Sequence, residues 1–149
     1  MRRDTFIPLL VAGGVVAILP PAVIHYISPQ QVMFSSASHF WSVVLASLLA
    51  TAAGVALSYG GWRRGDARAV LVGTAFTVMA SLLLVHGFAS PGFLVEMNGV
   101  VSLTGAATLP VGGVILALSA LPSARSPRAV RSLLWLQAAL MAGVVALGL

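Results

Sequence analysis

Three histidines and a glutamate are the side chains in this sequence best suited to bind a metal ion. They are His25, His39, His86 and Glu96. Neutral imidazole is the commonest protein ligand for zinc and copper, and three imidazoles can occupy three corners of a tetrahedral site. Water, Glu96, Met33 or Met97 could complete the site, where glutamate would favour zinc and methionine copper(I). The sequence therefore offers a candidate site for a copper or zinc ion.

Two other uses of the imidazoles stay open. Two histidines on different helices can be the axial ligands of a haem, and His39 and His86 are the candidate pair for haem b. Alternatively, each histidine is structural or responds to pH, with one ring nitrogen bonded to a carbonyl and the other to interfacial water. No two histidines stand three or four residues apart, so any shared site depends on how separate helices pack.

The residue patterns of common catalytic sites are missing from the sequence. The chain has no cysteine, and it contains no pair of adjacent carboxylates, phosphate-binding loop, serine nucleophile motif or His-Glu-x-x-His sequence. We therefore expect a protein that is not an enzyme.

The elements that must position these residues follow from composition. Of 149 residues, 59% are hydrophobic, and 7% are charged, against about 25% charged in an ordinary soluble domain. A soluble chain of this length leaves roughly 30% of its unfolded surface exposed to water, and it needs charged residues to cover that surface. The solvent of this chain must be largely lipid, and the bilayer is its expected partner.

Five apolar stretches are long enough to cross a bilayer, which takes about 20 helical residues. They lie near residues 6–27, 39–60, 69–88, 98–121 and 132–149. The sequence thus predicts an all-α membrane protein with five transmembrane helices in a single bundle domain spanning residues 1–149. Because the last stretch runs apolar to Leu149, we expect a fragment of a longer chain over a complete protein.

The charge distribution predicts the orientation of these spans. All eight basic residues are arginines, in three clusters: Arg2 and Arg3; Arg63, Arg64 and Arg68; Arg125, Arg128 and Arg131. The clusters alternate with loops that hold no arginine, so the positive-inside rule places the amino terminus in the cytoplasm and the carboxyl terminus outside it. This pattern explains the net charge of +5 without nucleic acid as a partner. It also gathers the four candidate ligands at the outer interface.

Small residues at helical spacing predict which helix faces pack in lipid. On the second stretch, His39, Ser42, Ala46, Ala50 and Gly54 form such a face. We therefore expect His39 to face into the bundle. Serines beside a helix start are normally caps, so we expect Ser38 to cap the second helix and Asn98 to cap the fourth.

Four segments of the chain resemble the amino-terminal membrane regions of actinobacterial multi-span signalling proteins. The segments are residues 39–41 (HFW), 61–66 (GWRRGD), 71–76 (LVGTAF) and 85–93 (VHGFASPGF), within residues 35–125. In that group a similar helix block precedes a cytoplasmic output domain, such as a diguanylate cyclase, a metal-dependent phosphohydrolase or a histidine kinase. The resemblance implies that His39, His86 and the Pro91-Gly92 turn belong to a sensing face. This chain departs from the group in having no output domain.

These observations favour a multi-pass sensory or input module of the inner (plasma) membrane, with an extracytoplasmic histidine-rich ligand site. Two alternatives remain at this point. The chain could be an accessory or cofactor-carrying subunit of a larger membrane complex, associated with further helices or subunits. It could also be a carrier for a small solute.

Overall fold

The computed structural model describes residue 26 and residues 35–92, 94–121 and 126–148. Apart from Tyr26, the first expected span lies outside these residues, and so does His25. The chain divides into two compact units, residues 1–34 and 35–149, and the second unit holds the helices described below.

Four helices account for four of the five expected spans. They are α2 (Ser36–Arg64), α3 (Ala67–Ala89), α4 (Gly99–Ser119) and α5 (Val130–Leu147), with the short 3₁₀ helix η3 (Pro127–Ala129) before α5. Each of the four is long and apolar enough to cross a membrane. An all-helical, multi-pass membrane architecture is thereby confirmed for the described part of the chain.

Local sequence signals set the helix ends. Ser35, and not the expected Ser38, caps α2: its side chain accepts a hydrogen bond from the Ser38 amide, so the helix begins earlier than hydropathy predicts. At its other end Gly65 adopts φ 66°, a left-handed conformation that suits glycine and ends the helix after Arg64. Asp66 then caps α3 by accepting from the Ala69 amide. Asn98 caps α4 as expected, with Oδ1 accepting from the Val100 and Val101 amides.

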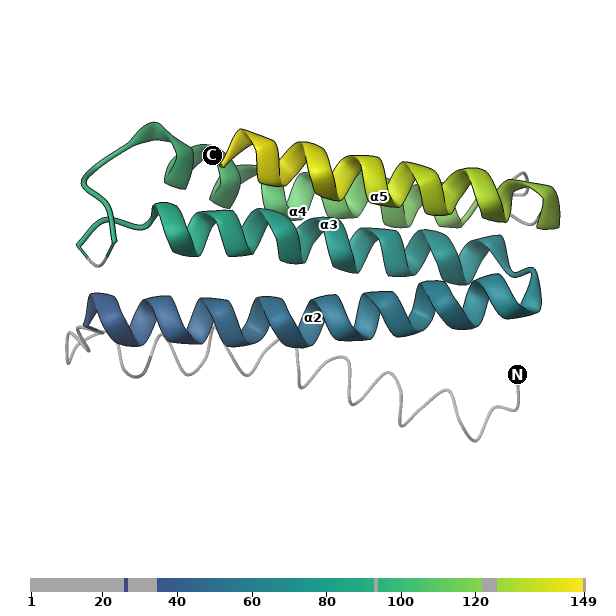
Figure 1. Cartoon of the computed structure of the whole chain (residues 1–149), viewed down its shortest axis with the longest axis horizontal. Helices are drawn as coiled ribbons and strands as arrows, with labels where there is room; N and C mark the ends of the chain where they lie inside the picture. Colours follow the sequence, from purple (N-terminus) through teal and green to yellow (C-terminus); the bar gives the residue numbers. More distant parts are fainter. Residues whose placement is uncertain (1–25, 27–34, 93, 122–125, 149) are drawn as a thin grey trace. The chain divides into compact units, whose positions relative to one another are not determined.

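Helix α3 is the centre of this unit (Figure 1). In the apolar stretch of α3, 61% of the residues are buried inside the structure, against 11 to 17% in the corresponding stretches of α2, α4 and α5. Successive helices run antiparallel, and the core cluster centres on Leu71, Ala75, Val78 and Leu82 of α3. Helix α3 is therefore the one helix of these four that packs closely against each of the other three.

Glycines allow α2 and α3 to approach closely. A Cβ at Gly54 would lie 2.7 Å from Thr77 Cγ2 and 2.8 Å from the Gly73 carbonyl oxygen. A Cβ at Gly61 would lie 2.8 Å from the Asp66 carbonyl oxygen. Such small residues bring helix backbones into contact in lipid, where no hydrophobic force joins helices.

The packing face of α2 differs from the expected one. Its buried residues are Phe40, Ser47, Gly54, Ser58 and Gly61, whereas Ser42 and Ala46 are exposed. Four of these buried positions recur every seven residues, which is the spacing that keeps one helix face against a partner in left-handed packing. The expected face followed a four-residue spacing, which drifts away from the partner along a helix of this length. His39 is accordingly exposed and lies at the edge of the contact.

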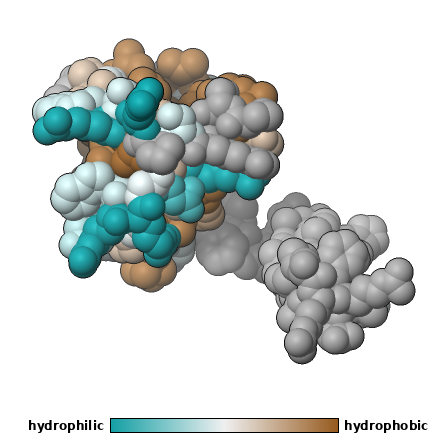
Figure 2. Space-filling view, turned by 90° about the vertical axis from the view of Figure 1, so that its right-hand side faces the viewer, coloured by the Kyte–Doolittle hydropathy of each residue, from teal (hydrophilic) through white to brown (hydrophobic). Residues whose placement is uncertain are grey.

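All described arginines lie at one end of the four helices. Arg63 and Arg64 end α2, Arg68 opens α3, and Arg128 and Arg131 precede and open α5. Figure 2 views this end and shows hydrophilic residues collected on it, with hydrophobic residues around the sides. Arg68 Nε also donates to the Ser119 carbonyl oxygen at 2.9 Å, which ties α3 to the end of α4. His39, His86 and Glu96 lie at the opposite end.

Candidate functional site

The connection between α3 and α4 shapes the end of the bundle that holds the histidines. Ser90 Oγ donates to the His86 carbonyl oxygen at 2.8 Å, and Gly92 adopts φ 90°, so the chain turns sharply after α3. Asn98 Nδ2 then donates to the carbonyl oxygens of Ala89 and Glu96, both at 2.9 Å. These bonds hold the connection against both helices.

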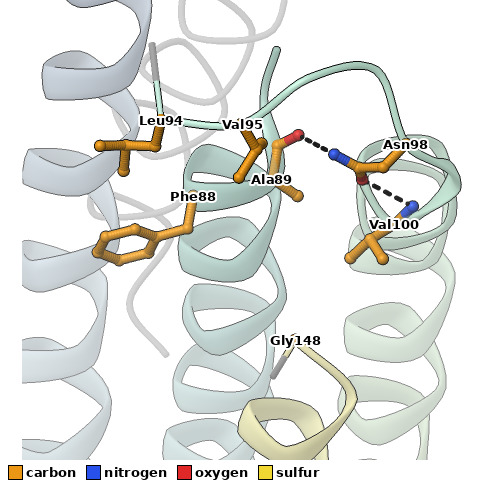
Figure 3. Close-up of a pocket in the computed structure, with 7 residues that line it drawn as sticks. All are labelled: Phe88, Ala89, Leu94, Val95, Asn98, Val100 and Gly148. Carbon is orange, nitrogen blue, oxygen red and sulfur yellow. Dashed lines mark hydrogen bonds between the residues drawn. The ribbon is translucent and has the colours of Figure 1, made fainter.

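A hollow of about 330 Å³ lies beside this connection (Figure 3). Its lining residues are Phe88, Ala89, Leu94, Val95, Asn98, Val100 and Gly148. Most are apolar, and the polar Asn98 already bonds to Ala89 and Val100, so the hollow offers a ligand few free polar groups.

The same end of the bundle brings two predicted ligands together. The ring centroids of His39, in the first turn of α2, and His86, in the last turn of α3, lie 6.0 Å apart with an interplanar angle of 77°. Beside them Phe40 and Phe88 make an edge-to-face contact with centroids 5.5 Å apart. The antiparallel packing of α2 on α3 therefore brings together both an imidazole pair and an aromatic pair at this end of the bundle.

A backbone carbonyl orients the His86 ring. His86 Nδ1 lies 2.9 Å from the Val101 carbonyl oxygen of α4. A carbonyl oxygen can only accept, so this bond requires the proton on Nδ1 and leaves the Nε2 lone pair for a proton or a metal ion. Gly105 makes room for the ring, because a Cβ there would lie 3.1 Å from Nδ1. His86 is half-buried, whereas His39 is exposed.

The remaining predicted ligands do not join this pair in the described structure. Glu96 is exposed in the connection before α4. Among residues 35–92, 94–121 and 126–148, no group of three or more histidine, cysteine, aspartate or glutamate side chains could hold a metal ion. His25 lies outside the described residues. The described site is therefore a pair of imidazoles.

A second polar cluster was not predicted as a site. Gln137 of α5 is 6% exposed, and its Nε2 donates to Thr77 Oγ1 of α3 at 3.0 Å. Gln137 Oε1 and the Oγ of Ser58, which is 4% exposed, are buried without a hydrogen-bond partner among the described residues. The signal in the sequence was the single glutamine within an apolar span, since polar residues are costly there and mark interhelical bonds or sites.

No family model matches the chain, and no curated protein or solved structure matches it either. The class of the protein therefore follows from its own helices, which define a multi-pass helical membrane protein. Its function must be argued from the imidazole pair.

Proposed function

We propose that this protein is a non-enzymatic sensory or input module of the inner (plasma) membrane, and that its imidazole pair binds a zinc or copper ion outside the cytoplasm. In this proposal the chain has five transmembrane helices, with the amino terminus in the cytoplasm and the carboxyl terminus outside. The arginines at the opposite end support this orientation through the positive-inside rule. The observation that carries the proposal is the His39–His86 pair, with rings 6.0 Å apart.

The geometry of the pair is compatible with a shared metal ion. Metal–nitrogen bonds of about 2.0–2.1 Å place the centroids of two imidazoles on one ion about 5–6 Å apart. The bond from His86 Nδ1 to the Val101 carbonyl oxygen also supports a ligand role. Metal-binding histidines almost always donate their other ring nitrogen to such an acceptor, which fixes the ring and raises its basicity. Water would complete the coordination.

The position of the pair suggests how binding reaches the cytoplasm. An ion held by His39 and His86 would link the outer ends of α2 and α3, and the Val101 carbonyl connects the same ring to α4. Because α3 packs against α2, α4 and α5, a shift at its outer end would change its contacts with all three helices. A ligand changes such an equilibrium only if it favours one helix arrangement over the other.

The test is metal content and zinc affinity of the detergent-purified protein. Elemental analysis and a visible spectrum on one sample separate zinc or copper from haem, which would give a Soret band. We expect His39→Ala and His86→Ala each to weaken metal binding at least about tenfold, since even outer-sphere changes cost 10- to 100-fold.

Two further variants complete the design. Ser42→Ala changes an exposed residue about one turn along α2 and should bind zinc as the wild type does. His25→Ala asks whether that histidine is a third ligand. Metal content that is unchanged in both His39→Ala and His86→Ala would overturn the proposal.

A further inference from the structure

The imidazole pair supplies fewer ligands than a zinc ion usually takes from a protein. Structural zinc sites are almost always four-coordinate, with all four ligands from protein side chains. His39 and His86 supply two, and no third histidine, cysteine, aspartate or glutamate joins them in the described part of the chain. His39 is exposed, so its ring is accessible from outside the bundle. A twofold axis beside the pair would bring a second pair of imidazoles to the same ion.

Small residues continue along α2 from His39 on an exposed face. The positions that recur every seven residues are His39, Ala46, Ala53 and Gly60, with Ser42 and Ala56 beside them. All of them except the half-buried Gly60 are exposed. The four recurring positions directly precede Phe40, Ser47, Gly54 and Gly61, which are buried. One residue is a turn of about 100° around a helix, so α2 carries a second face beside the one that packs on α3.

This second face suits close packing of two identical helices. Its seven-residue spacing keeps one face against a partner in left-handed packing, and its small residues let two backbones approach in lipid. Two copies in one membrane share the same orientation, so their α2 helices run parallel and like residues meet across a twofold axis. His39 then meets the partner's His39 at the outer end of the face. The helix contact and the metal site therefore share one axis.

We propose that the zinc ion lies between two copies of this chain, which pack through this second face of α2, and that His39 and His86 of each copy bind it. The inference rests on the proposed zinc site and names the partner that completes it. The second pair of imidazoles takes the places that water would fill in a single copy. An ion with ligands from both chains binds the dimer more tightly than the monomer, so zinc favours the paired state.

Cysteine cross-linking in lipid vesicles tests the helix contact. The chain has no cysteine, so Ala53→Cys and Ala52→Cys each introduce a single thiol. Both alanines are exposed on α2, but only Ala53 lies on the proposed face. A short bis-methanethiosulfonate should join two copies of Ala53→Cys and leave Ala52→Cys largely uncoupled. Equal yields from the two variants at low protein density overturn the contact.

Zinc stoichiometry separates this inference from the proposed function. We expect about one zinc ion per two chains by elemental analysis. Zinc should also raise the cross-linking yield of Ala53→Cys, and His39→Ala on that background should remove the rise. One zinc ion per chain without a rise in cross-linking overturns the inference and leaves the proposed function standing. A chain that binds no zinc overturns the proposed function, and the inference with it.

Leucine at Ala46 tests the link between the face and the metal. Ala46 is exposed and lies about 10 Å of helix rise from His39, too far to touch the ion. In the dimer Ala46→Leu forces the two α2 helices apart, so it should weaken zinc binding at least about fivefold. Ala52→Leu is the matched control on another exposed face and should bind zinc as the wild type does. Wild-type zinc affinity in Ala46→Leu overturns the inference.

Discussion

Alanine at Gly73 should force α2 and α3 apart. A Cβ at this position would collide with Ser58 Oγ, and it would lie 2.5 Å from the Gly54 carbonyl oxygen and 2.8 Å from the Ser58 backbone nitrogen. Two of these atoms are backbone atoms of α2, so the collision can be relieved only by moving the helix. Gly73→Ala is therefore a direct test of the close packing between α2 and α3.

The expected loss of stability in Gly73→Ala follows from two opposing effects. Overpacking a close contact costs about 1–3 kcal/mol, and collision with backbone atoms places this variant in the upper part of that range. Alanine offsets about 1 kcal/mol of the loss because it favours the helix more than glycine does. We expect Gly73→Ala to lower the free energy of unfolding by about 1–2 kcal/mol.

Gly113→Ala is the matched control for this variant. A Cβ at Gly113, in the interior of α4, meets no atom within 4 Å. Only the helix preference remains there, so the free energy of unfolding should rise by up to about 1 kcal/mol. Both variants are compared by titration with sodium dodecyl sulfate in mixed micelles, followed by tryptophan fluorescence and circular dichroism. If Gly73→Ala were as stable as Gly113→Ala, the close approach of α2 to α3 would be refuted.

Three further predictions concern the buried amide, the imidazole pair and the orientation. Thr77→Val removes the partner of the buried Gln137 amide and should lower the free energy of unfolding by about 0.5–2 kcal/mol in the same titration. Gln137→Leu should change it by less than about 1 kcal/mol, because the Thr77 hydroxyl keeps its bonds to carbonyls of its own helix; equal losses in the two variants would contradict this reasoning. Gly105→Ala places a methyl group 3.1 Å from the α3 imidazole and should weaken zinc binding about tenfold in titration calorimetry, and unchanged affinity would show that the ring is not positioned from α4. Because the chain has no cysteine, the variants E96C and R128C report orientation: a membrane-impermeant maleimide should label E96C in intact cells and R128C only after lysis, and the reverse pattern would invert the proposed topology.

The existence of the four described helices was predictable from the sequence, but their ends were predicted only approximately, since α2 runs from Ser36 to Arg64 where hydropathy predicts residues 39–60. In lipid, every backbone polar group must bond within its own helix, so a long apolar stretch becomes a helix whatever its neighbours are. The helix ends are equally local, as the caps at Ser35 and Asn98 and the left-handed Gly65 show. The gathering of arginines at one end also follows from where the clusters fall between the apolar stretches.

The packing faces and the sites were decided by tertiary structure. The buried stripe of α2 follows the path of α3 across it, and the expected face of small residues coincides with that stripe only at Gly54. The His39–His86 pair joins residues 47 positions apart, and the bond from Gln137 to Thr77 joins residues 60 apart. Helices in a membrane associate through close packing and a few interhelical hydrogen bonds, and both depend on the shape of the partner. Hydropathy, which is a property of each helix alone, carries no information about that shape.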